Sequence, residues 1–269
     1  MNETRYESSR TRLAIGAFTA TLHRDLVVTG REFVQFLVQA LMQPIFFLFI
    51  FGKVLPSIGL AAQGFTALLL PGIVALSSML ASLQGVTLPL VLDLGYAREI
   101  DDRLLAPQPA WVVAFEKLLI ASVRGTIAGL TIFPVGALIL GHAFAVRTDR
   151  IPALALMIVL TAATGAAIGL LMGTVIKPEQ ISLMFTLIFT PLIFTGCTYY
   201  PWPALEHIRW FQAITMINPL TYCSEGLRYA MVPGNIPTMM FGWVVVALIV
   251  GIALCTWAGT RTFLKRVVS

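Results

Sequence analysis

Apolar residues run through this chain in blocks that are too long for the core of a soluble domain. A helix needs about 20 predominantly apolar residues to cross a bilayer, and six blocks approach or exceed that length. They are Phe33–Leu55, Gly64–Pro89, Trp111–Leu140, Pro152–Ile176, Ile181–Tyr199 and Thr238–Thr260. Only 12% of the residues are charged, against about 25% in typical soluble domains. The sequence therefore predicts an all-α membrane protein with six transmembrane helices.

These six blocks leave little sequence for a second domain. We expect residues 1–32 to form a cytoplasmic tail and an interfacial helix, residues 33–260 the six-helix membrane domain, and residues 261–269 a second cytoplasmic tail. In the first part, Leu13–Leu22 is apolar on one helical face, which is typical of a helix lying in the membrane surface. An uncleaved helix is favoured over a signal peptide because this weakly apolar run contains Gly16 and is followed closely by charged residues.

Basic residues set the expected orientation, because cytoplasmic loops of membrane proteins are enriched in Lys and Arg. With both termini inside the cell, the inner segments hold 12 of the 18 Lys and Arg residues and the outer segments hold 5. The remaining one, Arg124, falls within a span. Both termini are therefore expected in the cytoplasm. The net charge of +5 reflects this topology, and nothing in the sequence indicates nucleic-acid binding.

Polar side chains within two spans are candidates for function. Gln35, Gln39 and Gln43 are four residues apart, so they share a slowly rotating face of the first span. Amides facing lipid are costly, so this face should look at protein or at a polar cavity. A helix-packing interface and a stripe that contacts substrate both remain open. Arg124 in the third span is either a functional residue or part of a structural ion pair with Glu116, two helical turns away.

The fourth span carries small residues at a strict four-residue spacing: Thr161, Gly165, Gly169 and Gly173. Small side chains on one helical face let the backbone of a second helix approach closely. This pattern predicts a tight helix contact and carries no indication of chemistry.

The most polar inner segment, Asp93–Pro109, lies between the second and third spans. It reads as a short amphipathic helix that ends at prolines. Mixed charges beside a leucine pair suit docking to a soluble partner, and a merely solvated loop remains the alternative. The residues expected to make the contact are Arg98, Glu99, Asp101, Asp102, Arg103, Leu104 and Leu105.

The segment Tyr199–Met231 before the last span is too apolar for a solvated loop and too broken to cross the membrane. Short re-entrant helices in the outer leaflet fit it best, anchored by aromatic residues. The residues that we expect to form this outer gate are Tyr199, Tyr200, Trp202, Asn218 and Pro219. Cys197 and Cys223 fall on the same side, where two unpaired thiols are favoured over a disulfide.

This arrangement resembles the permease subunits of ATP-binding-cassette (ABC) exporters of the type-2 family, over essentially the whole chain. The most specific match is Asn218-Pro219-Leu220-Thr221-Tyr222 followed by Glu225, Leu227 and Arg228, which looks like the asparagine-proline signature of that family. A second match runs from Arg98-Glu99-Ile100 through Leu104-Leu105-Ala106-Pro107 to Lys117. Here Ile100-Asp101-Asp102 replaces the more usual basic, glycine and threonine residues. The short loops look like the branch that exports drugs, lipids and lipo-oligosaccharides.

The resemblance implies a bacterial inner-membrane exporter in which two permeases, identical or different, bind cytoplasmic ATPase subunits. Spans two and five of the two copies would form a central path, with Met79, Leu83, Phe185 and Phe189 as candidate lining residues. The chain itself is not expected to be an enzyme or to bind a cofactor. Its Gly52-Lys53 pair is followed by Val54 within a span, so it does not make a phosphate-binding loop. ATP and Mg would be bound by the partner ATPase.

Other classes of function fit less well. A polysaccharide exporter permease is the nearest alternative. An intramembrane enzyme would need clustered reactive side chains at membrane depth, and His23, His142 and His207 are isolated near predicted surfaces. A secondary transporter or channel typically carries intramembrane carboxylates or an internal repeat, for which Glu116 alone is thin support.

Overall fold

A computed structural model describes residues 16, 30–31, 33–60, 64–97, 110–144, 146–234 and 236–268. Within these residues the chain is helical and contains no strand, and six helices are long and apolar enough to cross a membrane. The six-helix prediction is therefore confirmed. The candidate spans are Val34–Ser57, Phe65–Gly95, Trp111–Leu140, Ile151–Val175, Pro178–Thr195 and Phe241–Arg266. The predicted interfacial helix falls almost wholly outside the described residues.

The spans are built from the following elements. The first comprises α2 (Phe33–Phe49), a π-helical turn (Ile50–Val54) and α3 (Leu55–Ser57). The next three are α4 (Phe65–Leu92), α6 (Ala110–Leu140) and α7 (Ile151–Val175). The fifth is broken into α8 (Ile181–Met184), a π-helical turn (Phe185–Phe189) and α9 (Thr190–Thr195), and the last is α12 (Phe241–Val268). Two short helices, α10 (Arg209–Thr215) and α11 (Pro219–Met231), lie between α9 and α12.

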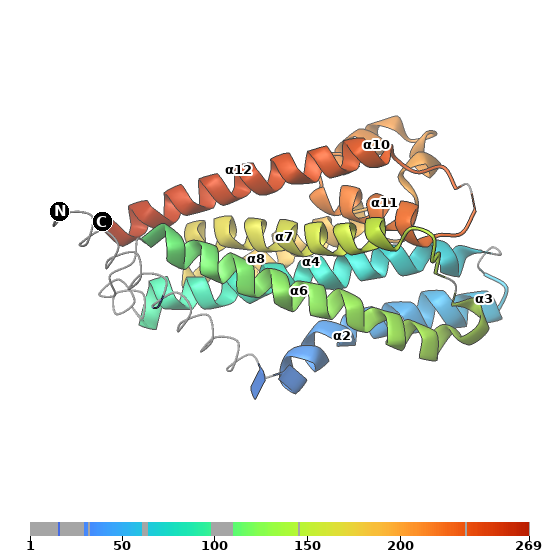
Figure 1. Cartoon of the computed structure of the whole chain (residues 1–269), viewed down its shortest axis with the longest axis horizontal. Coiled ribbons are helices and arrows are strands. Elements are labelled where there is room, and N and C mark those ends of the chain that lie inside the picture. The colour runs from blue at the N-terminus through green and yellow to red at the C-terminus, as the bar shows by residue number, and fades with distance from the viewer. Residues whose placement is uncertain are drawn as a thin grey trace, which may run out of the picture.

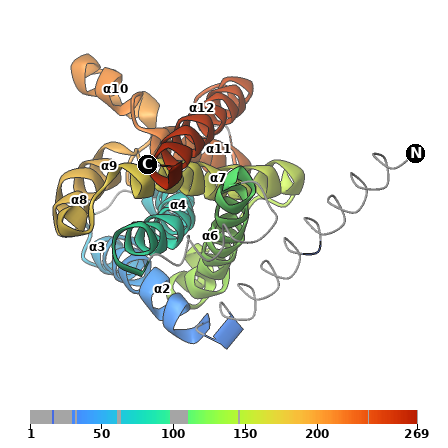
Figure 2. The same cartoon turned by 90° about the vertical axis from the view of Figure 1, so that its left-hand side faces the viewer.

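Helix α4 is the centre of the bundle. It packs against α2, α6, α7 and α11, and Figure 2 shows it between α2 and α6 on one side and α7 and α11 on the other. Most of its side chains are buried, from Leu69 through Leu83 without a break. Its sequence has no polar face because neighbours surround it, which is typical of a helix buried inside a membrane bundle.

The contact between α4 and α7 depends on the glycines of α7. A Cβ atom on Gly165 would lie 2.3 Å from the Met79 carbonyl oxygen, and one on Gly169 would lie 2.6 Å from that of Leu83. Both distances are far below van der Waals contact, so only glycine lets the two backbones approach this closely. Thr161 on the same face is fully buried. The close contact predicted from the spacing of these residues is confirmed, and its partner is α4.

The same packing places two of the candidate path residues. Met79 and Leu83 are completely buried within a single chain, against α7. Their role in a path between two copies stays a prediction. Phe189 is also largely buried, and Phe185 begins the π-helical turn of the fifth span.

The short helices α10 and α11 gather at one end of the bundle. Figure 1 shows this end opposite the C-terminal end of α12, with α3 on the same side. The segment before the last span is therefore broken into short helices, as its prolines and aromatic residues indicated. Helix α11 is buried between α4, α7 and α12, whereas α10 exposes most of its residues.

Candidate functional site

Helix α11 begins at a capped asparagine-proline pair. The Asn218 Oδ1 atom accepts a hydrogen bond from the backbone N–H of Leu220 (2.9 Å), and Pro219 occupies the first helical turn. This is the preferred start of a helix, because the cap satisfies an orphan N–H and proline needs no donor there. The Asn218 amide also donates to the Leu192 carbonyl oxygen (2.7 Å) and to Thr195 Oγ1 (2.9 Å). The cap therefore ties α11 to the end of the broken fifth span.

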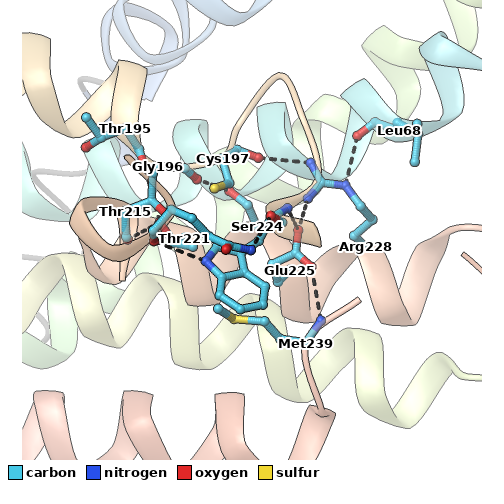
Figure 3. Close-up of polar contacts among 12 residues, drawn as sticks. Leu68, Thr195, Gly196, Cys197, Thr215, Thr221, Ser224, Glu225, Arg228 and Met239 are labelled. Carbon is cyan, nitrogen blue, oxygen red and sulfur yellow. Dashed lines mark hydrogen bonds and ion pairs between the residues drawn. The ribbon is translucent and has the colours of Figure 1, made fainter. Parts of the chain in front are cut away.

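A buried ion pair lies three residues apart on α11. The Arg228 guanidinium contacts the Glu225 carboxylate, and both side chains are fully buried. Arg228 also donates to the carbonyl oxygens of Cys197 (3.0 Å) and Leu68 (3.3 Å). Figure 3 shows the guanidinium between these two carbonyl groups and the carboxylate. Most of the donor capacity of the arginine is satisfied, as a buried charge requires.

The Glu225 carboxylate is held equally well. It accepts hydrogen bonds from the backbone N–H groups of Trp202 (2.9 Å) and Met239 (3.2 Å). The pair therefore joins four segments that are distant in sequence: α4, the segment after α9, α11 and the residues just before α12. We call Glu225, Arg228 and these backbone partners the outer cluster, after the side of the membrane that the sequence predicts for them.

Two further contacts bring the backbone around the outer cluster close together. A Cβ atom on Gly72 of α4 would lie 1.9 Å from the Thr198 carbonyl oxygen, so this approach requires glycine. On α11, Thr221 Oγ1 donates to the Thr215 carbonyl oxygen (2.6 Å) and Ser224 Oγ to that of Gly196 (3.0 Å). Both bonds are drawn in Figure 3.

The predicted gate residues lie next to the outer cluster. The Tyr199 ring packs 5.2 Å from that of Phe47 and 5.5 Å from that of Phe51, measured between centroids. The Tyr200 hydroxyl donates to the Phe194 carbonyl oxygen (2.7 Å), and Trp202 exchanges hydrogen bonds with Gln212. The sequence predicted that these aromatic residues lie together at one end of the bundle. Cys197 and Cys223 are both buried and free, as favoured.

The polar residues of the first and third spans meet at a second place. Gln39 and Gln43 of α2 and Arg124 of α6 line one cavity of about 190 Å³ beside α4, whereas Gln35 is exposed and does not line it. The Arg124 guanidinium carbon lies 5.8 Å from the centre of the Phe36 ring. Glu116 is fully buried and is not part of the lining. We call this space the α2–α4–α6 cavity.

Sequence reasoning missed two polar residues of this cavity, Ser77 and Gln84 of α4. They are seven residues apart, which places them on one helical face two turns apart. That spacing within an otherwise apolar span was the signal that could have found them.

At the opposite end of the bundle, several segments meet around the C-terminal end of α4 and the N-terminal end of α6. The Lys117 Nζ atom lies 2.6 Å from Asp93 Oδ2, with both side chains mostly buried. A Cβ atom on Gly95 would lie 2.2 Å from Cγ of Pro178, in the turn before α8. The Arg266 guanidinium of α12 donates to the Ile176 carbonyl oxygen (3.4 Å). The expected docking residues Arg98, Glu99, Asp101, Asp102, Arg103, Leu104 and Leu105 lie outside the described residues.

Nothing in the described part of the chain groups three or more His, Cys, Asp or Glu side chains in a way that could hold a metal ion. The fold and these two polar sites define a multi-pass membrane protein in which short helices are hydrogen-bonded to the spans at one end. The model of the family described as ABC-2 type transporter matches residues 16–232, and the chain belongs to that family. This match extends over the first five spans, α10 and α11. A comparison with curated proteins finds no match.

Proposed function

We propose that this chain is the membrane-spanning subunit of an ATP-driven exporter that moves an amphipathic drug, lipid or glycolipid out of the cell. The observation that carries the proposal is the match to the ABC-2 family over residues 16–232, which includes both the charged segment after α4 and the capped α11. Energy comes from a separate ATPase that binds ATP and Mg. The chain works beside a second permease copy in the bacterial inner membrane, with both termini in the cytoplasm.

Two structural features support a mechanism of coupling. The Asp93–Lys117 ion pair holds together the inner ends of α4 and α6, between which the charged segment lies. Close packing between Gly95 and Pro178 connects the same point to the fifth span. A push on the charged segment therefore reaches α4, α6 and the broken fifth span together. We propose that Glu99 makes the leading polar contact with the ATPase and that Leu104-Leu105 makes the apolar one.

The outer gate completes the proposal. Tyr199, Tyr200 and Trp202 lie on a segment that joins the end of α9 to the cap of α11, so motion of the fifth span acts on them directly. In this role the aromatic residues close the path above the cargo between cycles.

Co-purification of the ATPase with the permease, alongside cargo efflux from cells, tests this function. Leu105→Ala removes an apolar anchor worth about 1–3 kcal/mol if fully buried, and Glu99→Arg places a like charge against a basic partner surface. Both variants should remain folded in the membrane while they lose the ATPase and export. Lys53→Ala, which changes an exposed residue on the opposite side of the bundle, serves as the control. Normal association and efflux in both test variants would show that coupling lies elsewhere.

A further inference from the structure

The α2–α4–α6 cavity is lined by polar and charged side chains at membrane depth. Arg124 is 13 residues along α6 from Trp111, which is about 20 Å at 1.5 Å per residue. Three amides and one hydroxyl share the cavity with its guanidinium: Gln39, Gln43, Gln84 and Ser77. Polar groups at such depth mark pathways or binding sites by default.

The cavity opens at the surface of the chain. Gln39 and Gln43 on α2 are exposed, while Leu76 and Ser77 at its other wall are buried. The cavity therefore runs from the side of the bundle inward to α4, between α2 and α6. Figure 2 shows these two helices beside α4. A molecule in the bilayer reaches this opening without crossing the bundle.

The chemistry of the lining favours a negative charge. Arg124 is always protonated, and the described residues that line the cavity include no Asp or Glu. Gly85 lies beside the side chain of Arg124: a Cβ atom on Gly85 would be in van der Waals contact with Arg124 Cδ, at 3.8 Å. Ser77 Oγ is buried and has no hydrogen-bond partner among the described residues. An unsatisfied buried hydroxyl is destabilising, so a ligand that bonds to it gains affinity.

The size of the cavity limits what enters. A volume of about 190 Å³ is below the roughly 300–1,000 Å³ of pockets that enclose a drug-sized molecule. It is enough for a phosphate or carboxylate group. An attached alkyl chain remains outside, where Val38, Met42 and Phe46 are exposed on the surface of α2.

From these observations we infer that the α2–α4–α6 cavity binds the anionic headgroup, phosphate or carboxylate, of a single amphipathic molecule. Arg124 supplies the charge, and the amides and Ser77 supply hydrogen bonds. The alkyl tail lies along α2 in the membrane. The inference deepens the proposed function, on which it rests for its role in export: this is where an amphipathic cargo or a resident lipid is recognised before transport.

Photolabelling of the full-length chain in phosphatidylcholine nanodiscs tests the site. The probe is dodecyl phosphate with a diazirine on its alkyl chain, and the matched neutral probe is the corresponding dodecanol. The phosphate probe should label residues 38–46 of α2, along which its alkyl chain lies, and the alcohol should label them at least about tenfold less, as expected for loss of charge-assisted hydrogen bonds. Equal labelling by the two probes would overturn the inference.

Variants separate binding from folding. Arg124→Gln should lower labelling by about tenfold, and Arg124→Lys should retain more of it. Ser77→Ala should weaken labelling, whereas Ser78→Ala, also buried but outside the cavity, should not. Gly85→Leu fills the cavity and should abolish labelling in a preparation with a normal elution profile. Unchanged labelling in both Arg124→Gln and Gly85→Leu would contradict the site.

Two further measurements identify the source of the headgroup and separate failure of this inference from failure of the proposed function. Competition by phosphatidylglycerol in the nanodisc assigns the site to a resident anionic lipid, and lack of competition assigns it to a single-chain cargo. Labelling needs no ATPase. If the unmodified chain is not labelled by the phosphate probe but co-purifies with the ATPase, this inference alone is refuted, whereas failure to bind any ATPase refutes the proposed function alone.

Discussion

Two arginines inside this bundle have very different surroundings. Arg228 is 1% exposed, and its guanidinium contacts one carboxylate and two backbone carbonyl groups of distant segments. Arg124 is half-buried, lies beside an aromatic ring and borders a cavity that opens at the side of the chain. Both are charged groups in an apolar bundle, so each has to be stabilised by its surroundings.

The difference between the two surroundings indicates a different role for each region. At the outer cluster the charged groups bond to one another and to the backbone, so they hold four segments together. At the α2–α4–α6 cavity the lining leaves space beside the charge, so the region suits a ligand. Changes at the outer cluster should therefore reduce stability, and changes at the cavity should reduce binding.

The largest expected effect is at the outer cluster. Arg228→Met leaves the Glu225 carboxylate buried without its partner, and breaking a buried pair costs about 3–5 kcal/mol. The melting temperature and the folded yield in detergent should both fall sharply. Arg209→Met on the exposed surface of α10 is the control and should have little effect. Because the penalty comes from the uncompensated charge, adding Glu225→Gln should recover part of the loss. A stable single variant would show that the cluster does not hold the fold.

A smaller loss is expected at the contact between α4 and α7. Gly169→Leu forces side-chain atoms into the Leu83 carbonyl oxygen, and overpacking typically costs about 1–3 kcal/mol. Gly251→Leu is the matched control, because a Cβ atom there has no neighbour within 4 Å. Thermal unfolding and gel filtration should separate the two variants. A normal yield and elution profile for Gly169→Leu would count against the close contact.

The ion pair between Asp93 and Lys117 should contribute less to stability. Asp93 and Lys117 are 15% and 10% exposed, so Lys117→Ala should cost about 1–2 kcal/mol, between the values for surface and fully buried pairs. The swapped pair, Asp93→Lys with Lys117→Asp, should restore part of the stability. If the swap gives no recovery in thermal unfolding, the two side chains do not depend on one another.

The smallest effect is expected in the loop before α7, beside the outer cluster. The hydrogen bond from Arg147 holds the pKa of the Asp149 carboxyl below its ordinary value. A lowered folded-state pKa gives stability that is present above the ordinary value of about 3.9 and is lost as the pH falls through the folded pKa. Because the pair is solvent-exposed and screened, Asp149→Asn should leave the melting temperature at pH 7 within error. A large shift at that pH would show that this pair belongs to the outer cluster.

The sequence predicted the features that depend on local pattern. Six spans follow from the length of apolar blocks, and the α7 contact follows from glycines four residues apart. The start of α11 was not predicted, although the capping chemistry of the Asn218-Pro219 pair is local and could have indicated it. Each of these features depends only on residues that are close together in the sequence.

The features that were missed depend on partners far apart in the chain. Arg228 was noted, but its contacts are backbone carbonyl groups of Leu68 and Cys197, which no side-chain pattern identifies. Asp93 and Lys117 pair across 24 positions. The burial of Met79 and Leu83 against α7 could not be predicted, because an apolar side chain looks the same whether it faces lipid, a path or another helix.

The central claim is that this permease moves cargo only when a separate ATPase drives it. The most direct measurement is ATP hydrolysis by the reconstituted complex in the presence of a panel of lipids and drugs, with cargo movement followed in the same vesicles. We expect no hydrolysis by the permease alone, and stimulated hydrolysis with transport by the complex for amphipathic members of the panel. Transport by the permease alone, driven by an ion gradient without ATP, would contradict the account.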